Sequence, residues 1–167
     1  MQNDDEIFVY RGGNQVVPRD VRRVRIDKSV KIIPAGAFRF RRSLIYVEFH
    51  NSIKRIKRGA FEGCVSLKRV KLLGVEVIEM AAFLCCSGLT EVEFGDKLET
   101  IELTAFASFT SLRNITMPSV RTIGMWAFDR CRQLTELDLP ADLDTVGQGA
   151  FYDFPHCDAL PCNGKTT

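Results

Sequence analysis

A small group near the C-terminus holds the residue types best suited to chemistry: His156, Cys157 and Cys162. An imidazole and two thiolates are ligands that zinc accepts, but a fourth ligand is not evident and the spacing matches no usual zinc site. Two simpler roles compete with metal or redox chemistry, namely a cap held by packing and a Cys157–Cys162 disulfide. We therefore predict no catalytic residue, no metal and no cofactor, and we keep a metal or redox protein as an alternative.

The remaining cysteines and His50 do not form a reactive constellation, and no H-E-x-x-H, P-loop or G-x-G-x-x-G motif occurs. Cysteine and phenylalanine exchange at one repeated position, which holds Cys64, Cys86, Cys131, Phe109 and Phe154. Such an exchange indicates a buried apolar position rather than a ligand. We expect Cys86 to point inside, Cys85 to lie nearer the surface, and His50 to be solvated in a loop.

Charge is divided unevenly along the chain. Residues 1–83 contain 17 Lys and Arg against 9 Asp and Glu, whereas residues 84–167 contain 6 against 12. The basic runs near the N-terminus would suit phosphate, but the acidic second half would repel the same polymer, which disfavours nucleic acid. The division also suits a head-to-tail association of two copies, which salt would weaken.

The elements that must position these residues repeat along the chain. Six Ala-Phe pairs recur every 22 or 23 residues, a period typical of a solenoid. Their phenylalanines are Phe38, Phe61, Phe83, Phe106, Phe128 and Phe151. We expect the rings to stack as an internal ladder, in which removal of one ring would cost about 3–5 kcal/mol.

Each repeat starts with the pattern of a short strand. Apolar residues stand three and five positions after the first residue, as Val47 and Phe49 do after Leu44. This step of two places both side chains on one face of a strand. We expect six coils of 22–23 residues over 21–154, an N-terminal cap with a short hairpin over 1–20, and a C-terminal cap and polar tail over 155–167.

Side chains that point outward from these strands are the main candidates for a binding surface. Two columns result, whose charged and aromatic members are Arg23, Arg25, Tyr46, Glu48, Arg69, Lys71, Glu91, Glu93, Glu136 and Asp138. One interpretation is a ladder of cross-strand ion pairs, each worth about 0.2–1 kcal/mol. The other is a partner-binding face, basic toward the N-terminus and acidic toward the C-terminus, with Tyr46 as its aromatic contact. The two are compatible.

The run from Leu44 to Cys64, L-x-x-V-x-F-x-x-x-I-x-x-I-x-x-x-A-F-x-x-C, resembles the BspA-type leucine-rich repeat. The resemblance covers about 21–154. It implies an α/β-type solenoid, a curved right-handed β-α superhelix of mainly short parallel strands. A second sheet of very short strands and a short 3₁₀ or α turn at each Ala-Phe pair are also implied. The two columns would then lie on the concave face, and the family implies macromolecular binding without catalysis.

The first six residues are acidic and lack a signal-peptide pattern, and no apolar run reaches 18 residues. These features favour the cytoplasm or nucleus and predict no membrane span, although a fragment of a longer secreted protein would share them. We therefore predict a non-catalytic protein–protein interaction module whose partner is another protein. The first alternative is a cell-surface or secreted recognition fragment of the adhesin-like kind.

Overall fold

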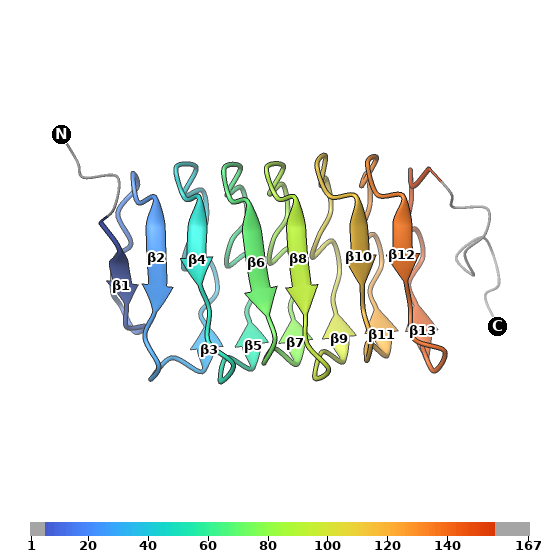
Figure 1. Cartoon of the computed structure of the whole chain (residues 1–167), viewed down its shortest axis with the longest axis horizontal. Coiled ribbons are helices and arrows are strands. Elements are labelled where there is room, and N and C mark those ends of the chain that lie inside the picture. The colour runs from blue at the N-terminus through green and yellow to red at the C-terminus, as the bar shows by residue number, and fades with distance from the viewer. Residues whose placement is uncertain (1–5, 156–167) are drawn as a thin grey trace.

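The computed structural model describes residues 6–155, which form a solenoid whose coils follow one another along one axis (Figure 1). Each of the six coils contributes one longer strand and one short strand, and the segment before them adds one further longer strand, β1. The longer strands are β1 (Phe8–Tyr10), β2 (Arg23–Ile26), β4 (Tyr46–Glu48), β6 (Arg69–Leu72), β8 (Glu91–Phe94), β10 (Asn114–Thr116) and β12 (Glu136–Asp138). The short strands are β3 (Ile32–Ile33), β5 (Arg55–Ile56), β7 (Val77–Ile78), β9 (Thr100–Ile101), β11 (Thr122–Ile123) and β13 (Thr145–Val146).

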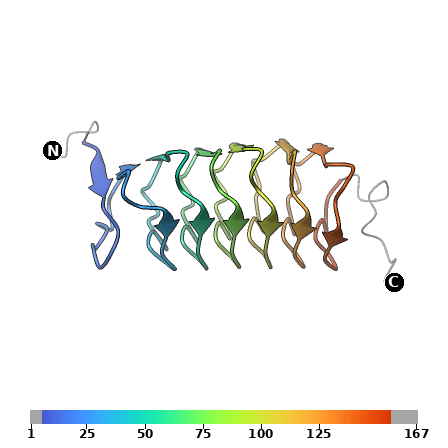
Figure 2. The ribbon, with the colours of Figure 1, turned by 90° about the horizontal axis from the view of Figure 1, so that it is seen from below.

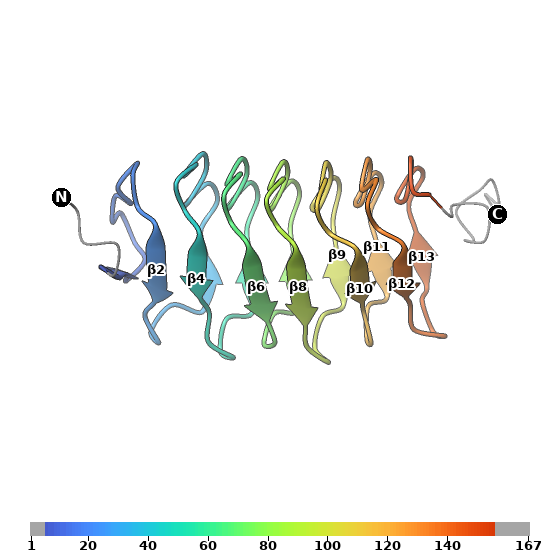
Figure 3. The same ribbon diagram turned by 45° about the horizontal axis from the view of Figure 1, so that its top comes forward.

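The strands form two parallel layers with the core between them (Figure 3). One layer holds the longer strands in the order β1-β2-β4-β6-β8, followed by a separate pair, β10-β12. The other layer is a continuous sheet of the six short strands. In both layers the strands pair in the register set by the repeat, so that Val70 lies opposite Val92 and Ile56 opposite Ile78.

The axis of the solenoid is nearly straight, in contrast to the curved shape that the resemblance implies (Figure 2). A solenoid curves when its two faces have different spacings between coils. Here β-strands pair along both faces, and paired strands lie about 4.8 Å apart wherever they occur. Because both faces are held near the same spacing, no strong curvature develops, and we name the outer surface of the longer strands "the long-strand face".

The hairpin expected in the N-terminal segment is not formed. β1 instead pairs parallel to β2, with Tyr10 opposite Ile26, so the segment adds a strand to the sheet. The turn at Gly12 and Gly13, both at positive φ, leads into a stretch that forms no strand. The Gln15 side chain fixes this turn by accepting the Arg11 N–H (2.6 Å) and donating to the Val9 carbonyl (3.1 Å). Val9 and Arg11 are thus bound to a side chain rather than to a second antiparallel strand.

The expected 3₁₀ or α turns at the Ala-Phe pairs are absent, since the described residues contain no helix. Around Phe61 every second N–H bonds to the following coil instead: Gly59 to Met80, Phe61 to Ala82 and Gly63 to Leu84, at 2.7–3.0 Å. A helix would need these N–H groups for its own carbonyls. The positive φ of Gly59 (61°) and Gly63 (70°) aims them along the solenoid axis, so the turn becomes a third line of hydrogen bonds between coils.

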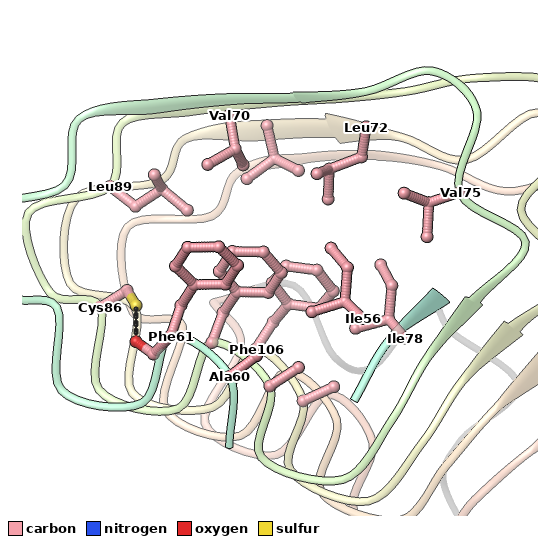
Figure 4. Close-up of a cluster of buried hydrophobic side chains, with 14 of the residues drawn as sticks. Ile56, Ala60, Phe61, Val70, Leu72, Val75, Ile78, Cys86, Leu89 and Phe106 are labelled. Atoms are coloured by element: carbon pink, nitrogen blue, oxygen red, sulfur yellow. Dashed lines mark hydrogen bonds between the residues drawn. The ribbon is translucent and has the colours of Figure 1, made fainter. Parts of the chain in front are cut away.

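A column of stacked phenylalanines runs through the core along the solenoid, and Figure 4 shows part of it with the aliphatic side chains around it. Consecutive rings from Phe38 to Phe151 lie 4.8–5.3 Å apart with interplanar angles of 3–6°. Tyr10 covers the first ring, edge to face at 4.9 Å. All six phenylalanines are buried, and so are the alanines that precede the last five of them. Each coil is therefore joined to the next by aromatic stacking as well as by backbone hydrogen bonds.

Beside the phenylalanine column lies the position at which cysteine and phenylalanine exchange. The Cys64, Cys86 and Cys131 thiols donate to the carbonyls of Phe38, Phe61 and Phe106 in the preceding coil, at 3.1–3.3 Å. In the fourth coil the same position holds Phe109, whose ring meets Phe106 edge on at 5.5 Å. Burial raises the pKa of Cys64 and of Cys131 to about 12 and raises that of Cys86 as well, so these thiols stay protonated.

Candidate functional site

The ten residues predicted to bind a partner all lie on the long-strand face. They come from β2, β4, β6, β8 and β12, at the strand positions that alternate with the buried ones. Strand β6 shows the reason: Val70 and Leu72 are buried, so Arg69 and Lys71 between and beside them point to solvent. The parallel register then lines up equivalent residues of successive coils in two columns.

Three ion pairs join neighbouring strands within these columns. The Arg25 guanidinium lies 2.8 Å from the Glu48 carboxylate, Arg69 lies 2.8 Å from Glu91, and Lys71 lies 2.7 Å from Glu93. The hydrogen bond to Glu93 raises the pKa of Lys71, and the one to Glu48 raises the pKa of Arg25. All six side chains remain about half exposed, so water screens each pair and each contributes little to stability. The basic half of the columns is thus compensated by carboxylates on the next strand.

Tyr46 lies in the middle of the basic half, with 40% of its surface exposed. The Arg23 guanidinium lies over its ring, 5.7 Å from the centroid, and Arg69 is its register partner on β6. An exposed tyrosine held between two arginines offers an apolar surface with a polar tip, which is the residue type enriched at interface centres. It is the one aromatic side chain among the ten predicted residues.

The long-strand face is interrupted between β8 and β10. No backbone ladder joins these two strands within residues 6–155, although β9 and β11 behind them still pair. A groove of about 490 Å³ lies beside this interruption; it runs over β10, between Glu91 and Glu93 of β8 and Glu136 and Asp138 of β12. The inward residues Val92 and Phe94 are 8% and 7% exposed, whereas their equivalents Val70 and Leu72 are 1% exposed. The core is therefore slightly uncovered at this point.

The two acidic side chains of β12, Glu136 and Asp138, are not brought into ion pairs. Asn114 and Thr116 of β10 lie opposite Glu136 and Asp138, where β6 would present Arg69 and Lys71. Within the part of the chain that the structure describes, the carboxylates of Glu136 and Asp138 make no ion pair and no hydrogen bond. The sequence contained this difference, but only the register shows that it leaves two neighbouring acidic side chains uncompensated.

The residues considered for metal or redox chemistry do not form a site in the described chain. Over residues 6–155, no three His, Cys, Asp or Glu side chains are placed to hold a metal ion. Cys85 is exposed and Cys86 buried, as expected. His50 is half-buried rather than solvated: its Nδ1 accepts the Ser52 N–H, and its Nε2 lies 3.0 Å from the Asp27 carbonyl. The group of His156, Cys157 and Cys162 lies outside the described residues.

Sequence reasoning missed an exposed apolar surface beside the short-strand sheet. Leu103 and Met125 occupy equivalent positions of successive coils and are 39% and 45% exposed. Trp126 follows Met125 and meets Tyr152 edge on at 5.7 Å, and Tyr152 is 60% exposed. The available signal was a large apolar residue at this position in three successive repeats, Met80, Leu103 and Met125, after Ala35 and Arg58 in the first two.

Two layers of parallel strands, one stacked phenylalanine per coil and an outward charged surface define a solenoid repeat protein. A family model described as "BspA type Leucine rich repeat region (6 copies)" matches residues 19–122 and 76–166. These matches cover most of the chain, which therefore belongs to the BspA-type leucine-rich repeat family. Proteins built from such repeats generally serve as protein-interaction or surface-type modules rather than as enzymes.

Solved structures of bacterial leucine-rich repeat proteins share the fold. A T. pallidum leucine-rich repeat protein matches with a TM-score of 0.73 and 29% identity, over 80% of this chain and 64% of its own. A leucine-rich cell surface protein of Faecalibacterium prausnitzii matches with a TM-score of 0.63 and 30% identity, over 70% of this chain and 32% of its own. A leucine-rich repeat protein of Bacteroides ovatus matches with a TM-score of 0.61 and 25% identity, over 82% of this chain and 45% of its own.

This chain thus spans between about a third and two thirds of the lengths of these three proteins. None of the curated proteins matches it. Among the described residues, no helix has the length and apolar character needed to cross a membrane.

Proposed function

We propose that the chain is a non-catalytic recognition module that binds another protein across the long-strand face. The observation that carries the proposal is the arrangement of that face. Its backbone is fixed by parallel ladders, while ion-paired charges surround the exposed Tyr46. A rigid surface loses little conformational entropy on binding, and an aromatic side chain among compensated charges is a favourable contact for a protein partner.

Capture from a lysate with three forms of the full chain tests this proposal. The first is the natural chain, and the second carries Arg23→Glu, Arg25→Glu and Lys71→Glu. The third, a matched control, carries Arg42→Glu, Lys57→Glu and Arg58→Glu, three exposed residues off the long-strand face with no ion pair in the described structure. A partner retained by the control and lost by the second form supports the proposal, once circular dichroism shows that all are folded. Equal capture by all three contradicts it.

A second candidate function is recognition at a cell surface. The matched Faecalibacterium prausnitzii structure is that of a leucine-rich cell surface protein, and this chain covers 32% of it. The proposed binding face would then act within a longer surface protein. Antibody labelling of intact source cells, with permeabilised cells as the control, separates the two compartments: signal only after permeabilisation contradicts the surface assignment.

Two further proposals concern association and metal content. The basic and acidic halves could join copies head to tail, and light scattering at low salt and high concentration would then give a mass above the monomer that falls when salt is added.

The C-terminal His156, Cys157 and Cys162 remain the alternative metal or redox group. Elemental analysis of the purified chain tests it, because metal content near zero excludes a resident metal there.

A further inference from the structure

Strands β6 and β8 show which side chains are missing from the groove over β10. On β6 and β8, the pair Arg69 and Lys71 lies beside the pair Glu91 and Glu93, with contacts of 2.8 and 2.7 Å. On β10 and β12 the register is the same, and the acidic pair is kept as Glu136 and Asp138. The basic pair is replaced by Asn114 and Thr116.

From this comparison we propose that the groove binds an extended segment of a partner that carries cationic side chains at positions i and i+2. Residues two apart in a strand point the same way and lie about 6.6 Å apart, so one segment can present both cations to both carboxylates. The inference rests on the proposed protein-binding function and adds to it the chemistry of the partner and the place where it binds.

Three observations favour a cationic segment over other occupants. Carboxylates stand on both walls; those on β8 already bind Arg69 and Lys71, whereas the pair on β12 has no cation among the described residues. The groove offers an open volume of about 490 Å³ beside the interrupted strand ladder, enough for side chains of a bound segment. The side chains of Val92 and Phe94 at its floor offer apolar contact to the aliphatic stems of lysine or arginine.

The test is an NMR titration of the full chain with a synthetic peptide in which arginine and lysine alternate with threonine. A peptide of the same composition with its cations adjacent is the first control, because neighbouring residues in a strand point to opposite sides. We expect the alternating peptide to shift the amides of Asn114, Thr116, Glu136 and Asp138, and to bind more tightly than the control peptide.

Three protein variants change the net charge by the same amount and so separate the groove from general attraction. Glu136→Gln with Asp138→Asn removes the acidic pair, and Asn114→Arg with Thr116→Lys supplies the missing cations from within. Each should weaken binding roughly two- to thirtyfold, the range for two exposed ion pairs. Asp96→Asn with Glu99→Gln neutralises two exposed carboxylates that have no ion pair in the described structure and should leave binding unchanged.

Several outcomes would overturn the inference. Equal binding by all three variants, or shifts confined to another surface, would show that the groove is not the site. If dilution of the protein alone shifts the same amides, the occupant is a second copy rather than a foreign segment. Failure of the peptide while capture still depends on Arg23, Arg25 and Lys71 would refute this inference and leave the proposed function standing.

Discussion

Replacement of Phe106 by alanine tests how the solenoid is held together. Phe106 is fully buried and stacks on Phe83 at 5.2 Å and on Phe128 at 5.3 Å. Phe94 and Phe109 meet its ring edge on, each at 5.5 Å. Truncation of a buried phenylalanine costs about 3–5 kcal/mol, and each aromatic pair adds about 0.5–1.5 kcal/mol beyond area burial. We therefore expect Phe106→Ala to lower the free energy of unfolding by about 4–5 kcal/mol, toward the upper end of that range.

Urea unfolding at equilibrium measures this loss, with far-UV circular dichroism and the fluorescence of Trp126, the single tryptophan, as probes. Phe151→Ala is the matched comparison, because among residues 6–155 that ring stacks only on Phe128 and meets Phe154 at 6.4 Å. It should lose about 3 kcal/mol, the lower end of the range. A loss from Phe106→Ala no larger than that from Phe151→Ala would refute the reasoning that stacking on both sides stabilises the interior coils.

Three further predictions follow from the same structure. In a chain carrying Cys157→Ser and Cys162→Ser, only the Cys85 thiol should react quickly with a maleimide, because Cys64, Cys86 and Cys131 are buried. Rapid reaction of all four thiols before unfolding would contradict that burial. The free energy of unfolding should fall as the pH rises from about 9 toward 12. Burial raises the pKa of Cys64 and Cys131 to about 12, so in this range only the unfolded chain loses these protons. Urea titrations at fixed pH values measure this dependence, and Cys131→Ala should make it less steep. Gly95→Ala should cost about 1–3 kcal/mol in thermal unfolding, because its Cβ would lie 2.0 Å from the Leu73 carbonyl oxygen, and an unchanged melting temperature would contradict this close approach of two coils.

The period of the sequence predicts the repeated parts of the structure well. Because Ala-Phe pairs recur at 22 or 23 residues, equivalent side chains fall into columns, and the partners Lys71 and Glu93 follow from counting alone. The choice between Cys and Phe at one position likewise indicates a buried site, as Cys64 and Phe109 show. These features depend on which residues are adjacent in successive coils, and that adjacency is fixed by the repeat length.

Features that depend on backbone direction could not be read from the repeat. Gly12 and Gly13 suit a hairpin, yet β1 pairs parallel to β2 because the Gln15 side chain takes the bonds that a second strand would need. The Ala-Phe turns lack helix because alternate N–H groups, such as that of Phe61, bond to the next coil. Conformations that depend on the neighbouring coil leave no mark in a single repeat.

The groove over β10 is a further feature that the sequence alone did not predict. The neutral Asn114 and Thr116 were visible in the sequence, but the interruption of the strand ladder beside them was not. The charged columns were therefore predicted as one continuous face, whereas the structure divides them into a compensated part on β2–β8 and an acidic part on β12.

Site-specific photo-crosslinking tests the central claim, that a partner protein binds the long-strand face, most directly. Benzoylphenylalanine would replace Tyr46 on that face or, as the control, Tyr152 outside it; both are exposed aromatic residues. After irradiation in source lysate, the account predicts a protein adduct of defined mass from the Tyr46→benzoylphenylalanine chain and no adduct of that mass from the control. An excess of the natural chain should prevent formation of the adduct. An adduct formed only from position 152, or equally from both, would contradict binding across the long-strand face.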